Sequence, residues 1–401
     1  MGIVMANTDT KCPLLWNHLH ISLGGNHSPC CHSQVFKDQG SWKEISWGQF
    51  DSKLGILSEQ HVKARQQMRE GKRVPLCEVC YRREDKGLVS KRINAFKDAE
   101  IEQWQIDYDS EPTSINSMDV KFDRTCNLGC RMCEPGQSSF LNRDLSKLQQ
   151  QDRFANEQTE WNKDYQQNEK LELAKRAVKD GLQTFKTTGG EPFLQRHFIE
   201  FVDWCIEQDY AKDLTMRITT NLILANKKLL NKLFQFREIG INVSCDAVGD
   251  VYEYIRYPAK WSDFDSKWQL LTQIVKQNPQ TKVDLTISSV LQIYNLFNLN
   301  DIQKYFQGYD WNVDQDLQPD GSELSVENLP QDVLDNWLAE SEHSESSQIS
   351  EVADYIKLLH NTDKEYKLKE FARKTLLYDH MRMQDYTVLD QPVIQLINNY
   401  K

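Results

Sequence analysis

The stretch CNLGCRMC, residues 126–133, decides how the rest of the chain is interpreted. Its three cysteines follow the spacing C-x3-C-x2-C, directly after an alternating run from Met118 to Arg124 that is typical of a strand. Three thiolates on such a loop can hold an iron–sulfur cluster, which normally takes four, so one iron would stay open for a non-protein ligand. A zinc site or buried thiols are the alternatives. Zinc motifs usually bring paired ligands to reach four, and no neighbouring His or Cys completes this one.

This motif resembles the cluster motif of the radical S-adenosylmethionine (radical SAM) enzymes, in which the amino and carboxylate groups of SAM chelate the open iron. Three further stretches match in the family's order, each after a strand-like run: GGEP at 189–192, ITTN at 218–221 and VSCD at 243–246. One difference is Met132, where the family often has an aromatic residue. Methionine is also apolar and can cover the cluster.

The resemblance implies a role for each matched residue. Gly189 and Gly190 would let the backbone approach SAM closely, and Glu191 would hold its amino group. The groups offered to the ribose would be the hydroxyl and amide groups of Thr219, Thr220 and Asn221. Ser244 would bond the carboxylate or the ribose. Arg256 is the candidate cation for the SAM carboxylate, with a structural ion pair as the alternative.

From residue 117 onward, six strand-like runs alternate with helical patterns, which predicts a parallel sheet with helices outside it. The predicted strands lie at 117–124, 184–188, 215–220, 240–246, 282–289 and 310–317. Six units are too few for a closed eight-fold barrel. The fold class that the resemblance implies is α/β, a partial (β/α)6 TIM-like barrel. Chemistry in such barrels lies at the carboxyl ends of the strands, where the matched motifs fall.

Residues 1–100 are predicted to form a small hairpin-plus-helix domain that binds a cluster. A strand-like pattern near 15–20, a Gly-Gly turn at 24–25 and a return strand from Pro29 predict a β-hairpin. A helix is predicted at about 47–69.

The cysteines of this first part are spaced like those of twitch, the short form of the SPASM auxiliary-cluster module. Cys12 and Cys30 would lie near the two ends of the hairpin, and with Cys77 and Cys80 they offer four thiolates, enough to close a second [4Fe–4S] cluster. Two differences are that the module usually follows the barrel, and that Cys31 lies beside Cys30; the family spacing favours Cys30. A structural zinc site with four cysteine ligands is the alternative.

The remaining segments complete the predicted organisation. Residues 101–116 are acidic and polar and are interpreted as a connector to a barrel domain at 117–320. Within that domain, 141–180 is rich in Gln, Glu, Lys and Asn and contains no Gly or Pro, which predicts a solvated helical insertion; a partner surface or a substrate lid is the alternative. Residues 321–401 are predicted to form a mostly helical extension.

Composition excludes several classes of protein. The 401-residue chain is 39% hydrophobic with a net charge of −11, which argues against a nucleic-acid binder that needs a basic stripe. No run of 18 apolar residues predicts a membrane helix. The first 15 residues lack the apolar core of a signal peptide. Seven of the ten cysteines fall into cluster-like spacings, so a reducing cytoplasm is expected.

The resemblance implies a reductive enzyme that cleaves SAM to a 5′-deoxyadenosyl radical, which abstracts hydrogen from a substrate. Its cofactors would be SAM, the [4Fe–4S] cluster that binds it and a second, auxiliary [4Fe–4S] cluster. Electrons would come from a reductant such as flavodoxin or ferredoxin. The expected substrate is a peptide or protein. A small-molecule dehydrogenase of the same class and a non-catalytic iron–sulfur or zinc protein that binds a partner are the alternatives.

Overall fold

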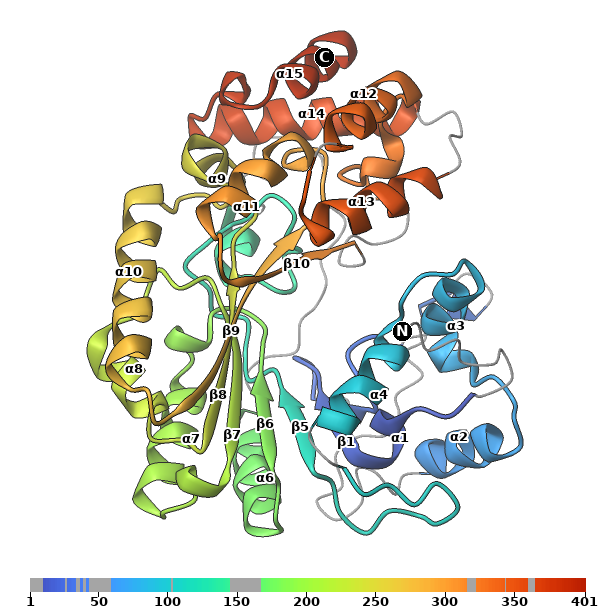
Figure 1. Ribbon diagram of the computed structural model, residues 1–401, viewed down its shortest axis with the longest axis vertical. Coiled ribbons are helices and arrows are strands. Elements are labelled where there is room, and N and C mark those ends of the chain that lie inside the picture. The colour runs from blue at the N-terminus through green and yellow to red at the C-terminus, as the bar shows by residue number, and fades with distance from the viewer. Residues whose placement is uncertain are drawn as a thin grey trace. The chain divides into compact units, whose positions relative to one another are not determined.

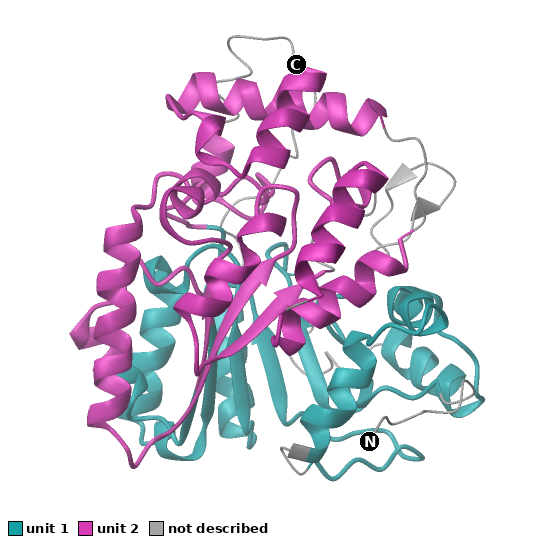
Figure 2. Ribbon diagram, turned by 45° about the horizontal axis from the view of Figure 1, so that its top comes forward, with its two compact units in different colours: residues 1–124, 160–218, 232–239 teal, residues 125–159, 219–231, 240–401 magenta. Residues whose placement is uncertain are grey.

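The computed structural model describes residues 10–25, 27–33, 37–38, 41–42, 59–101, 104–144, 167–315, 322–342, 344–359 and 365–401. The chain divides into two compact units (Figure 2). The first unit comprises residues 1–124, 160–218 and 232–239, and the second comprises 125–159, 219–231 and 240–401. The chain therefore passes between the units several times.

Eight strands form one sheet in the order β10-β9-β8-β7-β6-β5-β1-β2 (Figure 1). Their bounds are His18–Ile21 (β1), His27–Ser28 (β2), Ser117–Val120 (β5), Thr184–Thr187 (β6), Thr215–Thr220 (β7), Glu238–Ser244 (β8), Lys282–Val290 (β9) and Asp310–Asp314 (β10). The pairs β1–β5, β5–β6, β6–β7 and β9–β10 are parallel, whereas β1–β2 is antiparallel. This sheet confirms the predicted α/β class and is consistent with a partial barrel. A separate ladder joins Lys37–Asp38 (β3) to Ser41–Trp42 (β4).

All six predicted barrel strands are present, with small differences at their ends. The first stops at Val120 rather than at residue 124, because the chain there leaves the sheet toward the cysteine motif. The fourth begins and ends two residues earlier than predicted, at Glu238–Ser244. Alternation alone locates a strand well but does not mark where its hydrogen bonds end.

One face of the sheet in the first unit is apolar and covered by helices. The ring centroids of Phe185 on β6 and Phe201 on α7 (Arg196–Glu207) lie 4.2 Å apart. Helix α6 (Gln167–Lys179) packs beside α7. Apolar residues recur on α7 at helical spacing and are buried, which explains why this segment forms a helix against the sheet.

The N-terminal part of the first unit contains the predicted hairpin, as the antiparallel pair of β1 and β2, with different bounds. Residues before the first strand form a short helix, α1 (Pro13–Asn17), with proline at its first turn, where a missing N–H is tolerated. The return strand β2 lies at His27–Ser28, before Pro29 rather than after it. The chain continues through α2 (Glu59–Arg69), η2 (Pro75–Cys77), α3 (Glu78–Asp85) and α4 (Lys91–Ile101). Residues 47–58 of the predicted helix lie outside the described residues.

Strand β1 belongs to the predicted N-terminal domain yet extends the sheet of the barrel. It pairs in parallel with β5, with His20 opposite Asp119. These two buried side chains face each other, with 3.3 Å between His20 Nδ1 and Asp119 Oδ2. Beside them, His18 Nδ1 and Ser117 Oγ form a hydrogen bond of 2.9 Å. The N-terminal part is therefore attached to β5 by backbone and side-chain bonds, while the boundary predicted at residue 100 stays a prediction.

The second unit contains strands β9 and β10, barrel helices and the helices of the C-terminal segment. Barrel helices are α8 (Lys227–Leu233), α9 (Gly249–Ile255), α10 (Trp261–Gln277) and α11 (Leu299–Tyr305). Aromatic rings join α10 to the end of α11, as between Trp268 and Phe306, whose centroids are 5.0 Å apart. The C-terminal segment forms α12 (Gln331–Ser341), α13 (Ser347–Lys357), α14 (Glu365–Arg382) and α15 (Gln391–Tyr400).

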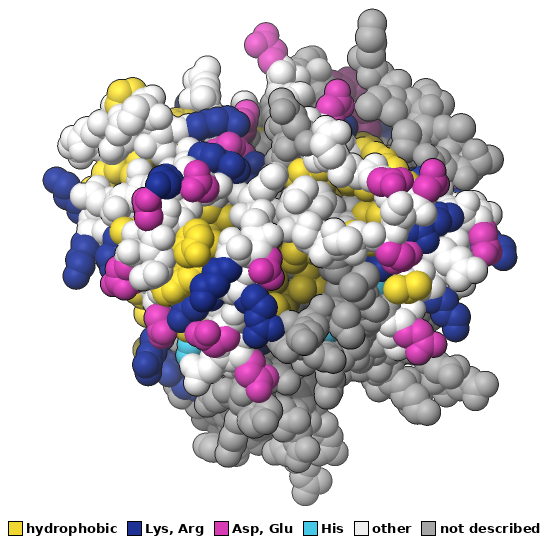
Figure 3. Space-filling model, turned by 90° about the horizontal axis from the view of Figure 1, so that it is seen from below, with side chains coloured by type: hydrophobic (Ala, Val, Ile, Leu, Met, Phe, Trp, Pro, Cys, Tyr) yellow, Lys and Arg dark blue, Asp and Glu magenta, His cyan; other side chains and the backbone are white. Residues whose placement is uncertain are grey.

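None of the described helices combines the length and hydrophobicity that a membrane span requires. On the face drawn in Figure 3, the described Lys and Arg side chains are interspersed with Asp and Glu. Neither sign of charge forms a continuous stripe on the described part of that face.

A buried lysine gives part of the predicted insertion a structural role. The end of segment 141–180 forms helix α6. Residues 145–166 of this segment lie outside the described part. Lys170 Nζ donates hydrogen bonds to the carbonyl oxygens of Leu23 and Lys121, both at 2.8 Å, and of Phe122 at 3.2 Å. Burial lowers the pKa of Lys170 to about 8. This side chain therefore fixes the exit of β5 and the turn after β1.

Replacing Lys170 by methionine should lower the free energy of unfolding by about 3 kcal/mol, because three carbonyl oxygens lose their donor. Urea denaturation followed by circular dichroism would measure this change. The matched control is Lys179→Met, at an exposed position on the same helix, which should alter stability by less than about 0.5 kcal/mol. Equal effects of the two substitutions would show that the three hydrogen bonds contribute nothing measurable.

Candidate functional site

The cysteine loop at 126–133 lies in the second unit and is fixed mainly through its backbone. The N–H of Gly129 donates to the carbonyl of Tyr257 at 2.8 Å. Ser138 Oγ donates to the carbonyl of Leu128 at 2.7 Å. A Cβ atom on Gly129 would lie 2.9 Å from Cδ1 of Phe140, so only glycine fits here without a shift of the ring.

The three thiols of this loop are free cysteines that differ in exposure. Cys130 is buried, while Cys126 and Cys133 are half-buried. Burial raises the pKa of Cys130, and the nearby Arg256 opposes the rise. Burial also raises the pKa of Cys133. Because iron binds the thiolate form, loading a metal here must release protons from these groups.

The ITTN stretch ends β7, and its asparagine contacts the cysteine loop. Asn221 Nδ2 donates to Oδ1 of Asn127 at 2.9 Å. Thr220 Oγ1 accepts a hydrogen bond from the N–H of Leu222 at 2.9 Å. Leu222 has a positive φ of 67°, so this turn is held in an uncommon backbone conformation. Thr219 lies in β7, immediately before Thr220. Asn221 thus orients the loop between Cys126 and Cys130.

Arg256 forms the structural ion pair that the sequence left as an alternative. Its Nε lies 2.7 Å from Oδ2 of Asp246, and both side chains are buried. Burial raises the pKa of Asp246, and Arg256 opposes the rise. Asp246 also accepts a hydrogen bond from the N–H of Val290 at 2.8 Å. Ser244, the last residue of β8, is half-buried.

The GGEP stretch lies in the first unit at the end of β6. Gly189 and Gly190 have φ angles of 82° and 52°, which favour glycine. Glu191 is fully buried, and its carboxylate accepts a hydrogen bond from the N–H of Phe193 at 3.2 Å. Glu191 therefore caps the short helix η3 (Pro192–Leu194). A ligand bound by Glu191 would therefore share its carboxylate with the N–H of Phe193.

Gln195 is a site residue that the sequence did not indicate. Its buried amide donates to the carbonyl of Asp123 at 2.9 Å and also to the carbonyl of Gly189. This side chain ties the GGEP turn to the segment that leaves β5. A glutamine three residues after a matched motif gives no signal of this role by itself.

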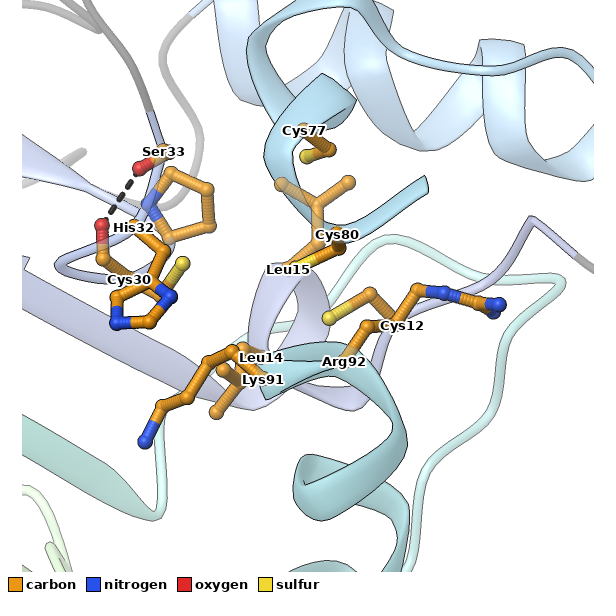
Figure 4. A pocket seen from close by; sticks show the side chains of 11 residues that line it. Cys12, Leu14, Leu15, Cys30, His32, Ser33, Cys77, Cys80, Lys91 and Arg92 are labelled. Carbon is orange, nitrogen blue, oxygen red and sulfur yellow. Dashed lines mark hydrogen bonds between the residues drawn. The ribbon is translucent and has the colours of Figure 1, made fainter. Parts of the chain in front are cut away.

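Four cysteines from three separate segments line one cavity in the first unit (Figure 4). They are Cys12, Cys30, Cys77 and Cys80. In Figure 4 their sulfur atoms turn toward one another. Burial raises the pKa of Cys12 to about 12, and the charge of Cys80 adds to this rise. The structure thus brings together all four cysteines predicted to bind an auxiliary group.

Cys30 and Cys31 differ although they are neighbours in the chain. Cys30 lines the cavity, whereas Cys31 is exposed and does not. The carbonyl of Cys30 accepts hydrogen bonds from Ser28 Oγ at 2.9 Å and Ser33 Oγ at 2.6 Å, which fix the turn. The structure therefore agrees with the spacing that favours Cys30.

No three His, Cys, Asp or Glu side chains of the described residues converge as ligands of one metal ion. The four thiols of the cavity lie near one another without meeting at a point. A zinc ion needs four sulfur atoms at about 2.3 Å from the same centre. In a [4Fe–4S] cluster each sulfur binds a different iron, so the four thiolates stand further apart. The two groups therefore differ in the spacing of the thiolates that they require.

Residues 120–276 match the family described as the Radical SAM superfamily. No curated protein matches the chain. The solved structures that resemble it include native anSMEcpe with bound AdoMet, at 15% identity and a TM-score of 0.37 over 67% of this chain and 62% of that one. Streptococcus suis SuiB bound to S-adenosylmethionine has 15% identity and a TM-score of 0.36 over 63% and 52%. TYW1 with a lysine-pyruvate adduct has 15% identity and a TM-score of 0.33 over 63% and 89%. This chain therefore spans less than two thirds of the length of the first two.

Proposed function

We propose that the chain is a radical SAM enzyme that cleaves SAM reductively and abstracts hydrogen from a peptide or protein substrate, since residues 120–276 match the Radical SAM superfamily. The observation that carries this proposal is the loop of Cys126, Cys130 and Cys133, which follows β5 inside the matched domain. When bound, the cluster and SAM supply a 5′-deoxyadenosyl radical.

The three cysteines of the loop fit an open [4Fe–4S] cluster. Three thiolates leave one iron without a protein ligand, as a bound SAM requires. The buried backbone of Leu128 and Gly129 keeps the loop in one conformation. Met132 supplies apolar cover beside Cys133. These residues orient the metal and exclude water from it.

The SAM-binding residues are proposed from the matched motifs. Gly189 and Gly190 bring backbone close to the ligand, and Glu191 binds its amino group while it caps η3. Ribose contacts are assigned to Thr219, Thr220 and Asn221. Ser244 is assigned to the carboxylate or the ribose. Arg256 is assigned to the carboxylate, and its ion pair with Asp246 leaves fewer guanidinium donors for SAM.

The second proposed cofactor is an auxiliary [4Fe–4S] cluster on Cys12, Cys30, Cys77 and Cys80. Support comes from the shared cavity and from the four buried or half-buried thiols that line it. A closed cluster could accept an electron from a substrate radical, which would give a net oxidation. It could also relay electrons inward. We assign this part of the chain to a twitch-like module.

The partners follow from the chemistry. Each reductive cleavage consumes one electron, so a reductant such as flavodoxin or ferredoxin is required. A peptide or protein substrate is proposed because auxiliary-cluster relatives often modify peptides, with a small-molecule dehydrogenase as the neighbouring possibility. A non-catalytic iron–sulfur protein is the alternative from another class, and SAM turnover separates the two.

Anaerobic reconstitution tests the proposal directly. The protein is loaded with iron and sulfide, and then given dithionite and SAM. We expect 5′-deoxyadenosine and methionine to form in equal amounts. A loaded protein that binds iron but forms no 5′-deoxyadenosine would favour the non-catalytic alternative. A protein that takes up no iron would refute the cluster assignment itself.

Replacing Glu191 by glutamine is expected to weaken SAM binding about 10-fold and leave the iron content unchanged, because a charged acceptor for the amino group is lost. Equilibrium dialysis with SAM and iron analysis would measure both quantities. The amide can still accept the hydrogen bond from Phe193, so the turn is retained. Lower iron with unchanged SAM affinity would show that Glu191 is structural.

A further inference from the structure

The C-terminal helix α14 contacts the cysteine loop through Arg131, the residue after Cys130. The Arg131 side chain is 1% exposed and forms an ion pair with Asp379 of α14, which is 8% exposed. Its Nε donates to the carbonyl of Tyr254 at 3.0 Å, and its Nη2 also donates to Gln384 Oε1 at 3.1 Å. The loop is thereby bonded to a helix about 250 residues further along the chain.

Aromatic rings enclose the same guanidinium. Its carbon lies 3.7 Å from the ring centroid of Tyr254, 5.6 Å from that of Tyr294 and 5.7 Å from that of Tyr378. The hydroxyl of Tyr254 donates to Oδ1 of Asp379 at 2.8 Å. Tyr254 therefore contacts both members of the ion pair. A buried cation held by a carboxylate and by ring faces has little freedom to move.

Arg382 provides a second link between α14 and the loop. Its Nη2 lies 3.0 Å from the position that a Cβ on Gly129 would take. The same group donates to Oδ2 of Asp144 at 3.0 Å, and the Arg382 side chain is 1% exposed. Its guanidinium also stacks on Tyr378 and Tyr257, at 4.3 Å and 4.8 Å from the ring centroids. Arg131 thus fixes the loop after Cys130, and the guanidinium of Arg382 lies beside the loop at Gly129.

These contacts have a consequence for any metal bound by the loop. Arg131 stands between Cys130 and Cys133 in the sequence, and its own N–H donates to the carbonyl of Ile255 at 2.9 Å. Fixing both the backbone and the side chain of this residue fixes the directions of the flanking thiols. Groups that orient metal ligands in this way typically change metal affinity about 10–100-fold when they are removed.

We propose that α14 is part of the cluster site, with Asp379 as the positioning residue that holds Arg131 and tunes the cluster. This inference rests on the proposed function, since it assumes a cluster on Cys126, Cys130 and Cys133. In this proposal, Asp379 has two effects. Its oxygen bonds set the loop conformation, and its negative charge offsets the Arg131 cation next to Cys130, which alone would favour addition of an electron to the cluster.

The test compares Asp379→Asn with the wild type and with a control on the same helix. Asparagine keeps an acceptor for Arg131 and for the Tyr254 hydroxyl but removes the charge. The control is Glu370→Gln, which removes a carboxylate from the partly exposed ion pair with Arg373. Readouts are the half-life of protein-bound iron in a chelator and the midpoint potential of the cluster whose electron paramagnetic resonance signal changes on addition of SAM.

In Asp379→Asn we expect iron to be lost about 10-fold faster and the midpoint potential to become more positive, while the control matches the wild type. A mere loss of packing would not predict the direction of the potential shift. Wild-type potential and iron half-life in Asp379→Asn would overturn the inference. So would an equal change in the control.

If Asp379→Asn does not fold, as judged by loss of its circular dichroism signal, a second variant tests the inference. Tyr254→Phe keeps the ring over Arg131 and removes only the hydroxyl bond to Asp379. It should lose iron severalfold faster than the wild type, and unchanged retention would overturn the inference. If the wild type binds iron but shows no signal that responds to SAM, the proposed function fails. In contrast, a normal SAM response in the wild type together with wild-type iron half-life and midpoint potential in the variants refutes only the role of α14.

Discussion

Replacing any one of Cys126, Cys130 and Cys133 by alanine is expected to abolish the formation of 5′-deoxyadenosine. Two thiolates cannot retain a cluster with an open iron for SAM, so the rate should fall below detection, at least about 1,000-fold. Liquid chromatography of anaerobic reactions with dithionite and SAM measures the product. The same samples give the iron content per chain.

The control for this prediction is Cys205→Ala. Cys205 is a fully buried thiol on α7, outside both cysteine sites, so its replacement tests the loss of a buried thiol alone. It should lower stability by about 1 kcal/mol and leave SAM cleavage at the wild-type rate. Product formation at the wild-type rate in any loop variant would exclude these cysteines as the cluster ligands.

The second large effect is expected from the cavity cysteines. Replacing Cys77 and Cys80 together by alanine should lower the iron content from about eight to about four per chain. Cleavage of SAM without substrate should continue, because the loop cysteines are intact, while substrate turnover fails. Iron analysis by plasma mass spectrometry measures the first change.

Cys31→Ala is the matched control, because Cys31 adjoins Cys30 but is exposed and outside the cavity. It should retain about eight irons. The complementary variant without Cys126, Cys130 and Cys133 should keep about four irons and remain coloured. Zinc in place of iron in that variant would identify a structural zinc site and remove the proposed electron relay.

The strands of the barrel could be predicted from the sequence because each is a short alternating run. Strands β8 and β10 show why: apolar residues alternate with polar or small ones in EIGINVS and DWNVD, so the strand itself contains the signal. The cysteine motif was equally local. Its three cysteines and the preceding strand lie within about 16 residues, so that spacing alone located the candidate site.

What could not be predicted depends on residues far apart in the chain. Nothing near Arg131 indicates that its partner is Asp379, 248 positions later. Lys170 lies in a polar segment interpreted as solvated, and only the tertiary fold shows that its ammonium group meets three carbonyls. Asp246 belongs to the VSCD motif, but only the structure shows its ion pair with Arg256. Burial of a charge depends on the elements that surround it, which a local pattern does not contain.

The pairing of β1 with β5 has a consequence for how the protein is made. One edge of β1 pairs locally with β2, whereas its other edge stays unpaired until residues 117–120 have left the ribosome, about 100 residues later. At about 5–20 residues per second, that interval lasts several seconds. During it, the strand next to the cavity cysteines exposes backbone donors and acceptors that can pair with other chains. A nascent chain arrested before residue 117 is therefore expected to depend on chaperones to stay unaggregated.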